Sequence, residues 1–179
     1  ADPANSVMVD INGILGKFRE DFYMRRAEFT QQWRMCQITN REERQGGIPE
    51  AMEGADVVIA LSKPGPGTIR PEWVKTMARD GIIFAMANPI PEIWPWEAHE
   101  AGAAVIATGR SDFPNQVNNS LGFPAIFRGT LDVRARTITD EMAIAAAQEM
   151  ARTAEEHGLS PEYIMPRMDD VEVFLRQAA

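Results

Sequence analysis

The stretch ADVVIAL, residues 55–61, is apolar apart from Asp56 and rich in β-branched side chains, and Gly54 precedes it. Short continuous runs of this kind, without polar alternation, are typical of strands buried on both faces of a parallel sheet. Three further runs resemble it: SVMVD at 6–10, IIFAM at 82–86 and AAVIA at 103–107. We therefore expect these segments to form parallel strands.

Helical patterns alternate with these runs. A proline stands in the first turn of segments 70–79 and 95–101, and a glycine follows each of them. A longer helix is expected over 140–157, with Thr139 as its N-cap and Gly158 after its end. Strands alternating with helices predict an α/β fold with a doubly wound parallel sheet.

Composition restricts the class of protein. The 179 residues carry a net charge of −8 and one cysteine, Cys36. The negative charge argues against nucleic acid as the main partner, and one cysteine excludes an internal disulfide. No apolar run is long enough for a transmembrane helix, and the first residues have no basic, apolar signal pattern. We expect a cytoplasmic protein with no membrane and no nucleic-acid partner.

Polar or glycine-containing segments follow the expected strands, at Asp10, 62–67, Asn88 and 108–119. In a doubly wound sheet, ligands bind beyond the carboxyl ends of the strands. We therefore expect these segments to converge on one crevice.

Asp10 is a candidate for binding a dinucleotide. An acid at the end of a strand in such a fold accepts hydrogen bonds from both ribose hydroxyls of the adenosine half and repels a 2′-phosphate. A plain turn closed by Asn12 and Gly13 also explains Asp10, and the sequence contains no G-x-G-x-x-G phosphate-binding turn.

The loop from Ser62 through Lys63 and Pro64 to Gly65 follows the strongest strand. Glycine lets the backbone approach a flat ring and proline stiffens the loop, although an ordinary strand-to-helix turn has the same composition. Asn88 precedes Pro89 and is placed to donate to a carboxylate or hydroxyl, but turns also favour Asn-Pro.

The stretch TGRSDFPNQVNNSLGFPAIFRG, residues 108–129, gathers four carboxamides between phenylalanines. A primary amide is costly to bury unless its donors and acceptor are used. The cluster therefore indicates a site that holds a polar ligand and is partly shielded from water; its amides are Asn115, Gln116, Asn118 and Asn119.

Other polar residues give weaker signals. His99 and His157 have no acidic or thiol partner at suggestive spacing and are expected to be solvated, and no metal-ligand spacing is present. Arg110, Asp112 and Arg128 form either an ion-pair network or ligand contacts, although Arg128 and Asp132 are also spaced to pair along a helix.

Four motifs, taken in order, resemble the NAD-binding domain of malic enzymes: ADVVIALSKPG, IIFAMANPIPEI, ATGRSDFPNQVNNSLGFPAIFRG and DVRARTITDEM. The resemblance covers about residues 2–173, and the first part, DPANSVMVDINGIL, is similar to the second strand of the family's Rossmann-like sheet. Residues 19–47 match poorly, and 16–47 have no secure assignment. On this basis residues 1–179 are part of an NAD(P)-binding domain that lacks the first strand and the glycine-rich turn.

The resemblance implies oxidative decarboxylation of L-malate to pyruvate and CO2, with NAD or NADP and Mg2+ or Mn2+. It implies that Asn88, Asn118 and Asn119 bind the substrate, with Asn118 favoured over Asn119 as the direct contact. It also implies cofactor binding by a set of residues on three loops: Asp10, Ser62, Lys63, Pro64, Gly65 and Asn88. Asp10 favours NAD, although Lys17 and Arg19 could still accept the phosphate of NADP.

In this family the catalytic tyrosine and lysine and the acidic metal ligands come from an N-terminal domain and the start of the NAD domain. The tyrosines and lysines of the present chain lie in other contexts, so the sequence assigns no catalytic or metal-binding residue to it: Tyr23, Tyr163, Lys17, Lys63 and Lys75. We expect this chain alone to be inactive and the full-length protein to be a homo-oligomer. The alternatives are a catalytically silent nucleotide-binding or regulatory module and another NAD-dependent dehydrogenase, such as one acting on amino acids.

Overall fold

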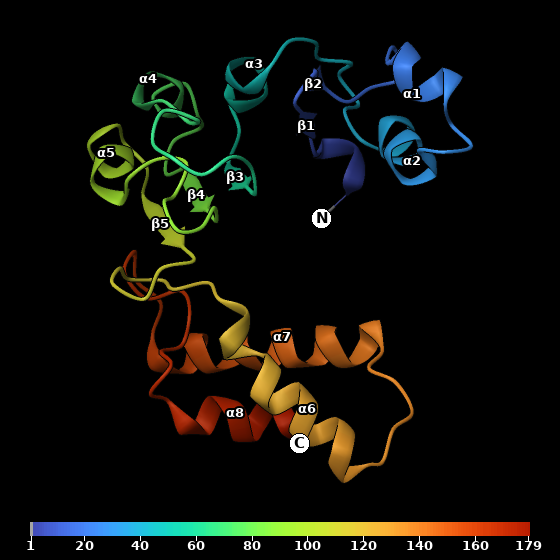
Figure 1. Cartoon of the computed structure of the whole chain (residues 1–179). Coiled ribbons are helices and arrows are strands. Elements are labelled where there is room, and N and C mark those ends of the chain that lie inside the picture. Colours follow the sequence, from blue (N-terminus) through green and yellow to red (C-terminus); the bar gives the residue numbers. More distant parts are fainter. Residues whose placement is uncertain (1) are drawn as a thin grey trace.

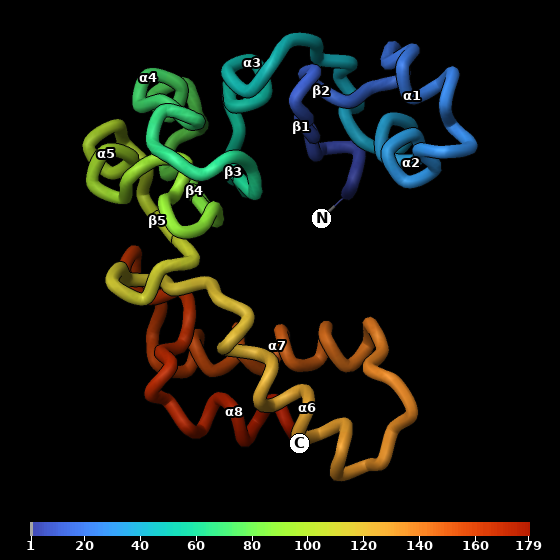
Figure 2. Tube along the Cα trace, in the orientation of Figure 1, coloured from blue at the N-terminus to red at the C-terminus, as the bar shows by residue number. Residues whose placement is uncertain are grey.

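A computed structural model describes residues 2–179. An N-terminal lobe, a sheet lobe and a helical C-terminal lobe follow one another along the chain (Figure 1), and the trace passes from the sheet into the helices through a single yellow segment (Figure 2). The N-terminal lobe contains η1 (Pro3–Asn5), β1 (Val9–Asp10), β2 (Gly13–Ile14), α1 (Glu20–Met24) and α2 (Thr30–Ile38). The sheet lobe contains α3 (Ile48–Met52), β3 (Val57–Ala60), α4 (Pro71–Val74), β4 (Ile82–Ala85), α5 (Pro95–Glu100) and β5 (Val105–Thr108). The C-terminal lobe contains η2 (Asn119–Leu121), α6 (Phe123–Asp132), α7 (Asp140–His157) and α8 (Val171–Ala178).

The central sheet is parallel, with strand order β3-β4-β5. Ile82 of β4 stands opposite Val57 of β3 and Val105 of β5, so the three strands end at one edge. Ile83 and Ala85 are fully buried beneath the neighbouring helices. The α/β class and three of the expected strands are confirmed.

The strand expected at 6–10 does not join this sheet. It shortens to β1, which pairs antiparallel with β2 in a hairpin. Ile11 and Asn12 form the turn between the strands, and Gly13, the first residue of β2, lies in the left-handed region at φ 114°. The backbone N–H of Asn12 donates to Asp10 Oδ1 at 2.8 Å, and the backbone N–H of Ile14 donates to Gly46 O at 2.9 Å. A tight turn therefore decides the local pairing.

The expectation that every strand is buried on both faces is wrong for β3. Val57 is 47% exposed and Ile59 is 66% exposed, whereas β4 lies between two strands. Within residues 2–179 both β3 and β5 are edge strands, and the face of β3 that carries Val57 and Ile59 has no cover.

The helices vary in how closely they follow their sequence patterns. The segment 70–79 is helical only in α4, because the backbone N–H groups of Thr76 and Met77 bond to the third residue before them, which tightens the chain into turns. The helices α5 and α7 begin where expected. Thr139 caps α7 by accepting from the N–H of Met142 at 3.4 Å, and Gly158 ends it at φ 91°.

The unassigned segment 16–47 folds as α1 and α2 around a small apolar cluster of Leu15, Phe22 and Cys36. Burial raises the pKa of the Cys36 thiol. In the C-terminal lobe α6 and α7 both contact α8. A Cβ at Gly129 would lie 2.6 Å from the carbonyl oxygen of Ala178, so glycine permits this close approach. None of the helices within residues 2–179 is long and apolar enough to cross a membrane.

Candidate functional site

The loops that follow β4 and β5 meet at Gly109. The side chain of Asn88 lies so close that a Cβ on Gly109 would be 3.1 Å from Asn88 Nδ2. Asn118 Nδ2 donates to Gly109 O at 3.3 Å. Two of the predicted substrate-binding residues therefore come together at the carboxyl ends of neighbouring strands, as the sequence pattern indicated.

The carboxamides of this region differ in how far they are already engaged. Asn88 and Asn119 are exposed, whereas Asn118 is half-buried and caps η2, its Oδ1 accepting from Ser120 N at 3.0 Å and Ser120 Oγ at 2.8 Å. One N–H of Asn118 donates to Gly109, which leaves the second N–H for a ligand. Each of these residues therefore retains hydrogen-bonding capacity.

Asn115 has a structural role instead. It is 5% exposed; its Nδ2 donates to Ile106 O at 3.1 Å and Pro161 O at 2.8 Å, and its Oδ1 accepts from Ile164 N at 2.8 Å. These bonds tie β5 to the segment before α8. Gln116 pairs in parallel with Thr108 beside the end of β5. The expectation that all four amides surround a ligand is therefore wrong for Asn115.

The predicted cofactor loop lies next to the Asn88 loop. Ser62, Lys63 and Pro64 are exposed and Gly65 is half-buried. The backbone N–H of Gly65 donates to Ile90 O at 3.2 Å, which joins the loops after β3 and β4.

Sequence reasoning missed Glu92, which is fully buried between these loops. Its Oε1 accepts from Ser62 N at 2.8 Å, and its Oε2 accepts from Ala87 N at 3.0 Å. A usable signal was present, because an acid between Pro91 and Ile93 interrupts a stretch that is otherwise apolar.

Asp10 forms an ionic triad in the N-terminal lobe. Arg19 is 8% exposed and donates from both terminal nitrogens to the two carboxylate oxygens of Asp10, at 2.9 Å each; its Nη2 also donates to Asp21 at 2.6 Å. The hydrogen bonds that Arg19 donates to Asp21 and then to Asp10 raise the pKa of Arg19, and the guanidinium lowers the pKa of Asp21. The Asp10 side chain remains 30% exposed. No hydrogen bond or ion pair within residues 2–179 joins this triad to the loops around Gly109.

Arg110 links the Asn88 loop to the amide loop. It donates to Pro89 O at 2.8 Å, forms an ion pair with Asp112 at 2.7 Å and lies over the rings of Trp94 and Phe113. Arg128 pairs along α6 with Asp132 at 2.7 Å and takes no part in this group. The expected network therefore separates into two pairs.

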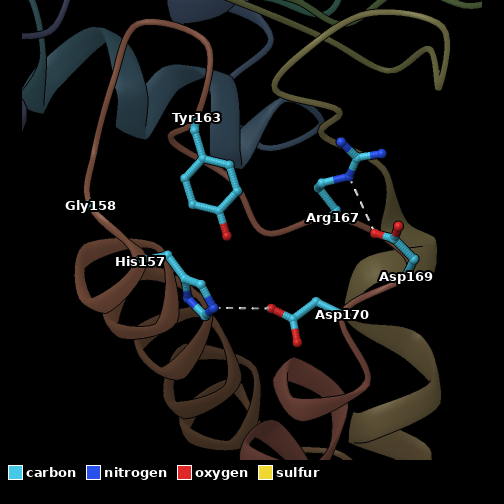
Figure 3. Close-up of a pocket in the computed structure, with 6 residues that line it drawn as sticks. All are labelled: His157, Gly158, Tyr163, Arg167, Asp169 and Asp170. Carbon is cyan, nitrogen blue, oxygen red and sulfur yellow. Dashed lines mark hydrogen bonds and ion pairs between the residues drawn. The ribbon is translucent and has the colours of Figure 1, made fainter.

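A cavity of about 370 Å3 lies elsewhere, beyond the end of α7. His157 Nε2 stands 4.0 Å from Asp170 Oδ2, and Arg167 pairs with Asp169 at 3.3 Å (Figure 3). Burial raises the pKa of Tyr163, whose ring lies over this hollow. His157 thus has an acidic partner that sequence spacing did not reveal, whereas His99 is exposed as expected. The charged groups here already pair with one another, so we place the candidate site at the strand ends.

Within residues 2–179 no group of three His, Cys, Asp or Glu side chains is placed to hold a metal ion.

Comparisons with known proteins point to one family. The family model described as "Malic enzyme, NAD binding domain" matches residues 3–179. An NAD-dependent malic enzyme of Geobacillus stearothermophilus is 51% identical over 141 residues, which cover 79% of this chain and 29% of that protein. An NADP-dependent malic enzyme of Rhizobium meliloti is 46% identical over 156 residues, which cover 87% of this chain and 19% of that protein.

A solved structure of malic enzyme from Entamoeba histolytica superposes with a TM-score of 0.93 at 50% identity, over 99% of this chain and 36% of that chain. The chain thus spans about a third or less of these relatives. The sequence match and the shared Rossmann-like α/β fold lead to one conclusion: the chain belongs to the malic enzyme family and corresponds to its NAD-binding domain.

Proposed function

We propose that the full-length protein is a malic enzyme that oxidatively decarboxylates L-malate to pyruvate and CO2 with a nicotinamide coenzyme. In this proposal the present chain binds the coenzyme and holds the substrate through Asn88 and Asn118, with Asn119 as a further contact. The meeting of Asn88 and Asn118 at Gly109 carries the proposal.

Neutral amides suit this substrate. Malate is a dianion that this family binds beside a metal ion, and a carboxamide donates to a carboxylate without adding a charge that competes with the metal. Holding the substrate in one orientation is itself a large contribution to rate. The residues around Gly109 would therefore act by positioning.

For the coenzyme we propose NAD. The Asp10 carboxylate is fixed by Arg19 yet partly exposed, so it retains lone pairs for a ribose hydroxyl. Two carboxylates surround the single guanidinium, so the triad has a net charge of −1 and would repel a 2′-phosphate. The Arg19 guanidinium already donates to Asp10 and Asp21, so it could bind the 2′-phosphate of NADP only by losing these bonds. Ser62, Lys63, Pro64 and Gly65 would flank the nicotinamide, together with Asn88.

The proposal divides ligand binding and catalysis between this chain and the rest of the full-length protein. A bound NAD would supply the hydride acceptor for this oxidation. We propose that the acid–base groups and the ligands for Mg2+ or Mn2+ belong to a separate catalytic domain of the full-length protein. We also propose that the full-length protein is a homo-oligomer in the cytoplasm. The free, buried Cys36 is consistent with a reducing compartment.

The substrate role is tested by Asn118→Asp in the full-length protein. Aspartate keeps the oxygen that caps η2 but replaces the donating N–H2 with a negative charge, so the malate KM should rise at least about tenfold while the fold survives. Gln148→Ala, an exposed carboxamide on α7, is the control and should change neither kinetic constant. Wild-type kinetics in Asn118→Asp would refute the role, and NAD binding without turnover of malate by the wild type would favour the silent module.

The coenzyme role is tested by Asp10→Asn. Loss of the charge should shift the ratio of kcat/KM values for NADP and NAD towards NADP by about tenfold, the effect of one nearby charge. Asp2→Asn, which removes the carboxylate of the exposed ion pair with Arg41, is the control. An unchanged ratio in Asp10→Asn would remove the argument for NAD.

A further inference from the structure

Glu92 stands out because its carboxylate is buried without a cation. It is 0% exposed, and no Lys, Arg or His lies within ion-pair distance among residues 2–179. Burying an unpaired charge is expensive, and proteins tolerate it where hydrogen bonds replace the lost water. The surroundings of Glu92 must therefore supply those bonds.

Three donors from two loops meet this carboxylate. Ser62 provides its backbone N–H at 2.8 Å and its hydroxyl at 3.2 Å, both to Oε1. Ala87 provides its backbone N–H at 3.0 Å to Oε2. A carboxyl group can accept on both oxygens at once, whereas an amide would turn an N–H2 towards one of these N–H donors.

These donors lie at the two places where the proposed ligands meet. Ser62 opens the loop assigned to the nicotinamide, and Ala87 directly precedes Asn88. Glu92 also contacts the far end of the Ser62 loop through its backbone. Its carbonyl oxygen accepts from Ile69 N at 3.1 Å.

We propose that Glu92 is a positioning residue that sets the coenzyme loop and Asn88 in one arrangement, so that NAD and malate binding depend on each other. The inference rests on the proposed malic enzyme activity. Glu92 itself touches neither ligand, since it is buried behind both loops.

The test is Glu92→Gln in the full-length enzyme. One of the two backbone donors would then face an N–H2 group, and a charge-assisted bond would become neutral. We expect the KM for NAD and the KM for malate each to rise about tenfold, with a smaller fall in kcat. The amide protons of Ser62 and Ala87 should exchange with solvent at least about tenfold faster.

Glu97→Gln is the matched control. Glu97 also accepts from a backbone N–H, that of Trp94 at 3.2 Å, but this bond only caps α5. Glu97→Gln keeps an amide oxygen that can accept this bond, and neither KM should change. If Glu92→Gln behaves in the same way, Glu92 is merely structural and the proposal is wrong.

Ser62→Ala keeps the proposal testable if Glu92→Gln does not fold. It removes only the hydroxyl bond and should raise the KM for NAD a few-fold, together with a smaller rise in the KM for malate. Unchanged constants in Ser62→Ala would overturn the proposal. A wild-type enzyme that does not turn over malate with NAD would instead refute the proposed function, so the two failures are distinguishable.

Discussion

Replacement of Asn115 by alanine should separate β5 from the segment before α8. The change removes three hydrogen bonds: those donated to the carbonyls of Ile106 and Pro161 and that accepted from the N–H of Ile164. At about 1 kcal/mol for each bond the cost is about 3 kcal/mol. Asn115 also lies at φ 54°, where alanine costs about 1 kcal/mol more than asparagine.

A total of about 3–4 kcal/mol corresponds to a roughly 100- to 1000-fold increase in local opening. Native-state hydrogen exchange on the full-length protein measures this directly, because the amide of Ile164 donates to the side chain that is removed. Asn119→Ala, an exposed amide in the same loop, should leave the exchange of Ile164 unchanged. An increase below about tenfold in Asn115→Ala would refute the structural role that we assign to this residue.

Gly129→Ala should destabilise the contact between α6 and α8 by about 2 kcal/mol, because its Cβ would meet a backbone oxygen at 2.6 Å. Gly122→Ala, whose nearest neighbour is a side-chain atom at 3.7 Å, is the comparison in a thermal melt, and equal melting temperatures would contradict this reasoning. Arg19 lowers the pKa of Asp21, so the stability from this pair is present at neutral pH and is lost as the pH falls through the lowered pKa. Asp21→Asn should therefore weaken the dependence of the denaturation midpoint on pH in the acid range, and an unchanged profile would contradict the assignment. Residues 1–179 expressed alone should aggregate or unfold without a sharp transition, because β3 exposes an apolar face and an unpaired edge; a cooperative calorimetric melt would show otherwise.

The sequence was most informative where structure depends on neighbouring residues. The helix α7 has the bounds expected from Thr139 and Gly158, and β3, β4 and β5 lie within or beside their apolar runs. Caps, turn residues and continuous apolar runs act over a few positions, so one sequence is enough to recognise them. The same reasoning placed Asn88 and Asn118 at adjacent strand ends.

Contacts between distant residues could not be predicted in this way. Asn115 bonds to residues that lie 46 and 49 positions away, and Glu92 bonds to a residue 30 positions away. Nothing local distinguishes Asn115 from a ligand-binding amide, and the apolar flanks of Glu92 indicate burial without revealing its partners. The hairpin at Asp10 is a different case, because the sequence indicated a turn near Asn12 and Gly13 but the apolar run before it was interpreted as a strand of the main sheet.

The lack of a side chain at Gly109 has a consequence for the size of substrate that the proposed site could hold. Its backbone conformation does not demand glycine, since Gly109 is not among the residues with positive φ; only the nearness of Asn88 excludes a side chain. One added methyl group would displace the Asn88 amide by a few tenths of an ångström while leaving every charge in place. On the proposed role of Asn88 and Asn118 in substrate binding, position 109 is therefore where an engineer or natural variation can alter the spacing of the two asparagines, and with it the length of dicarboxylic acid that fits, through volume alone.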